Sequence, residues 1–173
     1  MTRLENLLGA FALALTDRLL GAGPAAPGSV SERAALVTLH AHADRPVSWL
    51  GSVLGLTSSG VTRLVDRLVA DGSVTRAPGR DARSRQLTLS AAGRNRARAV
   101  LRARAEAMAA AVHGLSEADR AELERLLGLV MQGLAADMSG ALRVCRLCDR
   151  GACAAGGFAC PLASTYAAGG RDG

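Results

Sequence analysis

Lysine is absent from the 173 residues, so every basic side chain other than histidine is an arginine. The formal net charge is nevertheless +6, and the sequence pI is about 10.4. A chain with this charge favours an anionic partner, and nucleic acid and an anionic membrane surface are the two choices. An uninterrupted apolar run of about 18 residues, as a membrane-spanning helix requires, is also missing. We therefore expect a soluble, cytoplasmic protein that binds nucleic acid and not membrane.

A recognisable catalytic set is missing as well. The sequence has no motif that pairs a nucleophile with a base, no phosphate-binding loop and no helix with a His-Glu metal motif. Its three histidines are separated in sequence from the cysteines. We therefore expect that the chain is not an enzyme.

The composition that remains is that of a globular protein, with 49% hydrophobic and 21% charged residues. The length suits a small binding domain together with helices that dimerise it. Apolar residues at helical spacing predict a first helix from Leu4 to Leu19 and a final long helix from Ser116 to Met138. Because their apolar faces are broad, we expect these terminal helices to form a dimer interface.

Two further helices are predicted in the first half of the chain. Ser29, with Glu32 three positions later, fits a capping box and predicts a helix over residues 30–43. A short helix is predicted next, with Ser48 as its N-cap and Gly55 as its left-handed C-cap residue. These elements would support the helix that follows.

The next predicted helix begins at Thr57 or Ser58 and ends at Gly72. Apolar residues occupy one of its faces, and hydrogen-bonding side chains occupy the other. A helix that reads the major groove of DNA requires this arrangement, since one face is fixed to the protein and the other contacts base edges.

Residues 73–89 change to an alternating pattern and predict a β-hairpin with a turn at Pro78-Gly79. Its tip is rich in positive charge that Asp81 alone offsets, and the arginines are Arg76, Arg80, Arg83 and Arg85. Such a density of charge suits phosphates or a minor groove. Helix, turn, helix and basic hairpin is the order of a winged helix-turn-helix domain.

The predicted fold is therefore mainly α with a small β-hairpin wing. A long helix from Ser90 to Val112 should follow the wing, with a buried set of Val100, Leu101, Ala105, Met108 and Val112. We divide the chain into an N-terminal dimerisation helix and linker (1–28), a winged helix-turn-helix DNA-binding domain (29–93), C-terminal dimerisation helices (94–144), a cysteine-rich segment (145–163) and a disordered tail (164–173).

All four cysteines are confined to that cysteine-rich segment, and they are Cys145, Cys148, Cys153 and Cys160. The two-residue spacing of the first pair suits two thiolates on one tetrahedral ion, and nearby glycines allow tight turns. We predict that the four thiolates bind a metal centre, with zinc as the first choice. An iron–sulfur cluster and redox-active thiols remain the alternatives.

Residues 4–140 resemble the MarR family of bacterial regulators. The stretch Asp81–Gly93 is similar to the family's wing signature, and Thr62–Gly72 is similar to its recognition helix. The resemblance implies a homodimer with interlocked first and last helices, and control of DNA affinity by a ligand or a redox event. It also implies that Arg83 enters the minor groove, oriented by Asp81, and that the DNA-facing residues of the recognition helix are Ser58, Ser59, Thr62, Arg63 and Arg67.

We therefore expect a sequence-specific transcriptional regulator that acts as a homodimeric repressor on a pseudo-palindromic operator in double-stranded DNA. A small-molecule effector, a metal or a redox signal would control it. Two alternatives remain, a redox or iron–sulfur sensor that uses the C-terminal cysteines and a winged-helix module that binds protein.

Overall fold

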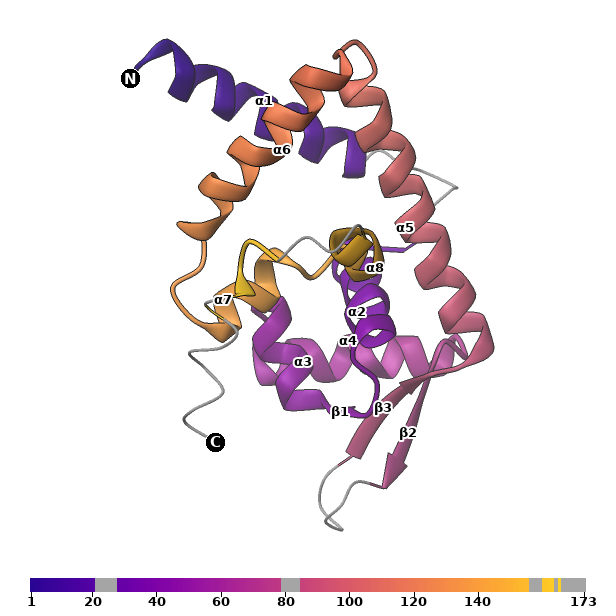
Figure 1. Cartoon of the computed structure of the whole chain (residues 1–173). Helices are drawn as coiled ribbons and strands as arrows, with labels where there is room; N and C mark the ends of the chain where they lie inside the picture. The colour runs from indigo at the N-terminus through magenta and orange to yellow at the C-terminus, as the bar shows by residue number, and fades with distance from the viewer. Residues whose placement is uncertain (21–27, 79–84, 156–159, 164, 166–173) are drawn as a thin grey trace.

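The computed structural model describes residues 1–20, 28–78, 85–155, 160–163 and 165. The linker at 21–27, the tip of the hairpin at 79–84, residues 156–159 and the predicted disordered tail apart from Thr165 lie outside the described residues. The elements in chain order are α1 (Arg3–Leu20), α2 (Val30–Ala41), β1 (Arg45–Pro46), α3 (Val47–Leu54), α4 (Ser58–Ala70), β2 (Val74–Pro78), β3 (Arg85–Leu89), α5 (Ala91–Val112), α6 (Glu117–Gln132), α7 (Met138–Val144) and α8 (Arg150–Ala154). Figure 1 shows a small sheet at one end of the molecule, next to α3 and α4, and the helices α1 and α6 at the opposite end.

The predicted capping box at the start of α2 is present. The Ser29 hydroxyl accepts a hydrogen bond from the Glu32 N–H at 3.3 Å, and the Glu32 carboxylate accepts one from the Ser29 N–H at 2.9 Å. Two donors that a helix N-terminus would leave unpaired are thereby satisfied. The helix ends at Ala41, two residues before the predicted end at residue 43.

Helix α3 ends as predicted but begins differently. Gly55 at its C-terminus has φ of 66°, the left-handed conformation that favours glycine. The prediction of Ser48 as N-cap is wrong, because α3 begins at Val47 and the N-cap is Pro46. Pro46 belongs to β1 and pairs with Gln86 of β3, so the extended backbone of the sheet leads directly into the helix.

The three strands form one antiparallel sheet in the order β1-β3-β2. The predicted hairpin is confirmed as β2 and β3, whose register pairs Val74 with Leu89 and Pro78 with Arg85. Strand β1 has two residues, too few for the alternating pattern on which a strand prediction rests.

The main core lies between α2, α3, α4, the sheet and the start of α5. Its largest fully buried side chains are leucines, which are Leu36, Leu39, Leu50, Leu64, Leu68 and Leu87. Gly93 brings α5 against the sheet so closely that a Cβ there would overlap the carbonyl oxygen of Ser73. The winged-helix part is thus a compact unit, and the predicted mainly helical fold with a β-hairpin wing is confirmed.

The two long helices after the wing differ from expectation. Of the predicted buried set in α5, only Val100 is buried, whereas Ala97 and Gly93 are buried instead. The core covers the first half of α5, and the second half extends past it (Figure 1). Helix α6 has no fully buried residue and ends at Gln132, so the predicted final helix to Met138 is split and Met138 begins α7.

Candidate functional site

Helix α4 separates its apolar and polar residues onto opposite faces. Val61, Leu64, Val65 and Leu68 are buried, and the helix packs against α3, α2 and β2. The Thr57 hydroxyl accepts a hydrogen bond from the Gly60 N–H at 3.2 Å, which satisfies a donor at the helix start. The packing and the cap fix the outer face of α4 relative to the rest of the domain.

The outer face of the N-terminal half of α4 carries the residues that we predicted to face DNA. Ser58, Ser59, Thr62 and Arg63 are all exposed. The Thr62 hydroxyl donates to the carbonyl oxygen of Ser58 at 2.9 Å, which leaves its lone pairs toward solvent. Arg63 has no ion-pair partner in the part of the chain that the structure describes. This half of the helix therefore offers hydroxyl groups and one guanidinium to an external partner.

The C-terminal half of α4 makes ion pairs within the protein. Arg67 Nε donates to Glu32 Oε1 at 3.1 Å, and Arg76 of β2 pairs with Asp66. Two of the predicted DNA-binding arginines therefore already have carboxylate partners. Burial alone would raise the pKa of Glu32, but the Ser29 N–H and the Arg67 guanidinium outweigh it and hold the pKa below its usual value.

The hairpin is only partly described. Arg85 is exposed at the first position of β3, opposite Pro78, where the sheet leads into the wing tip. Arg80, Asp81 and Arg83 lie outside the described residues, so their predicted roles stay predictions.

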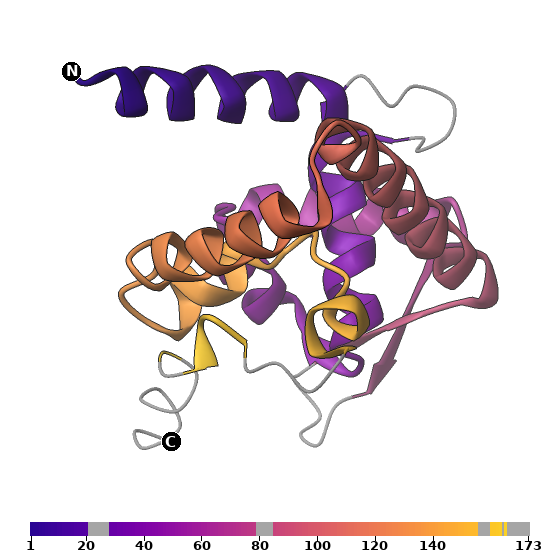
Figure 2. The same cartoon turned by 45° about the horizontal axis from the view of Figure 1, so that its top comes forward.

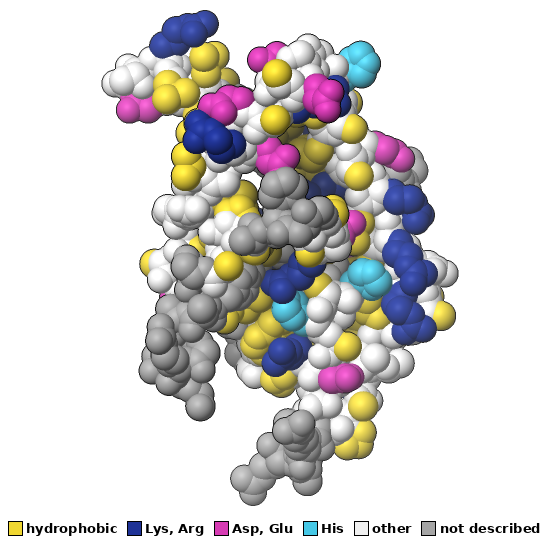
Figure 3. Space-filling view, viewed as in Figure 1, with side chains coloured by type: hydrophobic (Ala, Val, Ile, Leu, Met, Phe, Trp, Pro, Cys, Tyr) yellow, Lys and Arg dark blue, Asp and Glu magenta, His cyan; other side chains and the backbone are white. Residues whose placement is uncertain are grey.

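Basic side chains also follow α5. Figure 3 shows them as a dark-blue series along one edge of the molecule. Arg96 pairs with Asp71 at the end of α4 and with the Ser73 hydroxyl, so it joins α5 to the helix-turn-helix unit. Burial would raise the pKa of Asp71, but its hydrogen bonds from Ser73 and Arg96 lower it overall. The sequence did not reveal this pair, since its members lie 25 residues apart.

The four cysteines lie on a short folded segment after α6. Cys145 is the C-cap of α7, and the Cys148 N–H donates to its carbonyl oxygen at 2.9 Å. Cys153 lies in α8, and Cys160 precedes the buried Leu162. A hydrogen bond with the Cys145 thiol, followed by burial, raises the pKa of Cys148, while burial and the nearby Cys160 and Cys145 raise that of Cys153.

These thiols stand near one another without forming a ligand set. In the described residues no three side chains of Cys, His, Asp or Glu converge closely enough to hold a metal ion. The predicted zinc and iron–sulfur sites therefore stay predictions. The raised pKa of Cys148 disfavours the thiolate, the form that both metal ligation and redox chemistry require at this residue.

A pocket of about 530 Å³ lies between residues 148–151 and the helices α2 and α5. Val37 and His40 of α2 form one wall, Leu101 and Arg102 of α5 form another, and Cys148 is among the residues that close it. Arginine and aliphatic side chains together give the pocket a mixed character, suited to a molecule with an anionic group and an apolar body.

None of the helices in the described ranges combines the length and apolarity needed to cross a membrane.

A sequence model of the MarR family matches residues 29–84. The structure is similar to a MarR family protein from Bacillus stearothermophilus, with 28% identity, a TM-score of 0.68 and coverage of 75% of this chain and 91% of that one. It is similar to RV1404 from Mycobacterium tuberculosis, with 27% identity, a TM-score of 0.64 and coverage of 75% and 90%.

A more distant similarity extends over the same fold. MepR, a transcription regulator of the Staphylococcus aureus multidrug efflux pump MepA, has 18% identity, a TM-score of 0.66 and coverage of 78% of this chain and 99% of its own. No curated protein matches the chain. Proteins of the MarR family are transcription regulators and not enzymes, so this similarity favours the prediction that the chain is not an enzyme. The match over residues 29–84 and the shared fold of the surrounding helices show that the chain is similar to MarR-family regulators.

Proposed function

We propose that the chain is a homodimeric, sequence-specific DNA-binding repressor whose recognition helix is α4. The exposed polar face of the N-terminal half of α4 carries this proposal. Recognition helices of helix-turn-helix proteins contact base edges through their N-terminal residues, and the side chains in that position here are Ser58, Ser59, Thr62 and Arg63. The net charge of +6 supports a polyanionic partner.

In this proposal the arginines of the DNA-binding surface have different roles. Arg63 is available for a paired hydrogen bond to the O6 and N7 atoms of guanine. Arg67 and Arg76 are held by Glu32 and Asp66, so they contribute positive potential near phosphates and not base reading. Arg85 and the wing-tip arginines contact phosphate or the minor groove.

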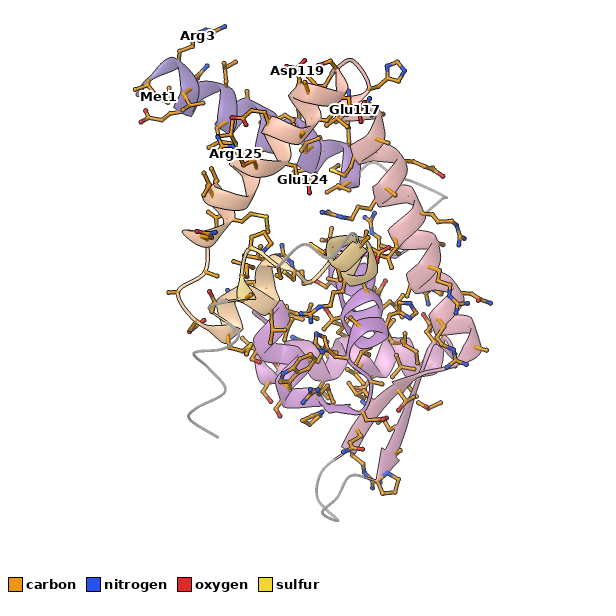
Figure 4. All side chains as sticks on the ribbon, viewed as in Figure 1. Met1, Arg3, Glu117, Asp119, Glu124 and Arg125 are labelled. Atoms are coloured by element: carbon orange, nitrogen blue, oxygen red, sulfur yellow. The ribbon has the colours of Figure 1, made fainter. Side chains whose placement is uncertain are left out.

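A second copy of the chain supplies the partner for α1 and α6. The two helices cross in the view of Figure 1, but Figure 2 shows α1 projecting from the body of the molecule, and its main contact within the chain is with α5. In Figure 4, Met1 and Arg3 mark the free end of α1, while Glu124 and Arg125 lie on α6. Apolar side chains remain exposed on both helices, and they are Leu4, Leu7, Leu8, Phe11 and Leu13 of α1 and Leu126, Leu127, Leu129 and Val130 of α6. An apolar surface of this kind marks a protein interface. A twofold dimer presents two recognition helices to two half-sites, which requires a pseudo-palindromic operator.

DNA binding tests the proposal directly. Duplexes that the purified protein retains from a random-sequence pool are labelled, and their affinity is measured by fluorescence anisotropy over a range of salt concentrations. We expect Arg63→Ala to weaken binding by about 1–3 kcal/mol and to relax specificity at one position of each half-site. Arg125→Ala is the matched control, since Arg125 is also exposed but pairs with Glu122 on α6. Equal loss in both variants, or none in Arg63→Ala, contradicts the assignment of α4.

The pocket between α2 and α5 supports control by a small molecule. We propose an effector that carries a carboxylate on an apolar ring, because Arg98 and Arg102 line the pocket beside Val37 and Leu101. Benzoate serves as the probe. We expect it to raise the melting temperature of the parent protein, as a ligand of the native state does, and to have less effect on Arg102→Ala. No stabilisation at millimolar benzoate would reject this class of effector.

A further inference from the structure

The C-terminal cysteine segment, residues 145–163, contacts α2 and α5 near its beginning. The buried Thr38 of α2 donates its hydroxyl to the carbonyl oxygen of Arg146 at 3.3 Å. Leu147 packs against Val37 of α2 and Val100 of α5. The beginning of the segment is thereby joined to both α2 and α5.

The preceding helix makes a third contact, at the turn of the helix-turn-helix itself. Arg143 of α7 lies over Gly55, where an added Cβ would meet the guanidinium carbon at 3.0 Å. Ala141 and Leu142 of the same helix are buried, and α7 packs against α3. The segment is thus fixed at its beginning, and the buried Leu162 fixes it again after Cys160.

Between these two contacts, the described helix α8 covers little apolar surface. None of the residues of α8 is buried, and the helix has only five residues. Too little apolar surface is covered there to offset the conformational entropy lost on folding, so a defined structure requires another source of stability. Ligation of a metal by side chains is the usual source in small segments of this kind.

We propose that Cys145, Cys148, Cys153 and Cys160 bind one zinc ion, and that the ion fixes the segment against α2, α3 and α5 and so controls the affinity of the protein for DNA. The adjacent, hydrogen-bonded thiols of Cys145 and Cys148 provide the first two ligands. Among the described residues no three of the four cysteines converge, so Cys153 and Cys160 join the first pair when the ion binds. Binding releases the thiol protons to solvent, because the ligands are thiolates.

The charges around the thiols suit such a centre. Four thiolates leave a net negative charge on a divalent ion, and arginines lie near enough to offset it. The charge of Arg104 of α5 acts on Cys148, and that of Arg150 at the start of α8 acts on Cys153. The zinc site does not depend on the proposed function. The effect of zinc on DNA binding does rest on the proposed function.

Metal content tests the site. The full chain is purified under reducing, anaerobic conditions, and its zinc, iron and inorganic sulfide are measured. We expect one zinc per chain, its loss in Cys148→Ser and Cys153→Ser, and its retention in Ser139→Ala, an exposed position in α7. A parent protein that holds no zinc and takes up none when zinc is added overturns the proposal. A brown protein that contains iron and sulfide overturns it in favour of a cluster.

Limited proteolysis and far-UV circular dichroism then show what the ion does to the structure. Chelation should raise cleavage beyond about residue 140 while the helical signal largely persists, because the core has its own buried leucines. A global loss of helix on chelation would contradict the local role that we assign to the ion.

A pair of Thr38 variants tests the link to DNA. Thr38→Val removes the hydroxyl that binds the Arg146 carbonyl, and Thr38→Ser retains it. In the parent and in Thr38→Ser, we expect chelation to weaken binding to the selected duplex by about 5- to 150-fold, the usual range of coupling between two sites. In Thr38→Val the zinc content should be unchanged, and chelation should weaken DNA binding by a smaller factor than in the parent. Equal DNA affinity of zinc-loaded and chelated parent overturns the regulatory claim, and failure to bind any duplex would instead refute the proposed function.

Discussion

Replacing Leu126 with alanine shortens one apolar side chain on α6, the helix that we propose as part of the dimer interface. Leu126 is 44% exposed in the single chain, although it lies in a row of leucines and valines. If a second copy covers this row, the variant loses apolar contact only in the dimer. The protomer should still fold, because Leu126 is not part of the main core and no residue of α6 is fully buried.

The size of the effect follows from the exposed fraction. Full burial of a leucine side chain stabilises a protein by about 1.5–3 kcal/mol. Since slightly less than half of Leu126 remains to be covered, its share in the interface is about 1 kcal/mol. A twofold dimer loses this amount twice, about 2 kcal/mol, which raises the dissociation constant about 30-fold.

Sedimentation equilibrium over a concentration series measures this constant. Val30→Ala is the control, because Val30 is 40% exposed and apolar but lies at the start of α2. We expect the control to dimerise like the parent. A parent protein that sediments as a monomer at micromolar concentration would refute the proposed interface, and so would equal dissociation constants for the parent and Leu126→Ala.

Three further predictions concern the wing, the core and the pH dependence. Arg83→Ala should weaken DNA binding without changing the oligomeric state, since an arginine at the wing tip places charge where the groove potential is deepest; binding as tight as that of the parent at the same salt would rule out this role. Gly93→Ala should lower the free energy of unfolding, measured in a urea titration, by about 1–3 kcal/mol or more, because the added methyl group overlaps the backbone of Ser73. In the control Gly114→Ala the added methyl group meets no neighbour, so the free energy of unfolding should fall by less. Glu32 has a lowered pKa in the folded state, so its contribution is present above the unfolded pKa of about 4.3 and is lost as the pH falls below it. Glu32→Gln should therefore destabilise the protein at pH 7 by about 1 kcal/mol and show a smaller loss on acidification than the parent, and parallel pH profiles would contradict this.

Local signals were sufficient to predict the helix-turn-helix and the hairpin. The capping box of Ser29 and Glu32, the left-handed Gly55 and the apolar spacing from Val61 to Leu68 each depend on residues close in sequence. The predicted DNA-facing residues of α4 are exposed for the same reason, because helical periodicity assigns them to the face opposite the core.

Features that depend on distant residues were not predictable. The pairing of Arg67 with Glu32 spans 35 residues, and it occupies a guanidinium that we had assigned to DNA. The buried set of α5 was misplaced because periodicity identifies an apolar face but not how far along the helix the core extends. The contact between Leu147 and the helices α2 and α5 has no counterpart in the local pattern.

The tight contact at Gly93 ties the position of the wing to the direction of α5. At its N-terminus the helix is joined to the wing through Gly93 and to the end of α4 through Arg96, so these parts move with it. The helix has 22 residues and is therefore about 33 Å long. A change of about 5° in its direction at Val112 displaces the wing by about 3 Å. Movements of this size exceed the tolerance of hydrogen bonds. In the DNA complex that we propose, a small rearrangement near the far end of α5 would therefore be enough to disrupt the contacts of α4 and the wing.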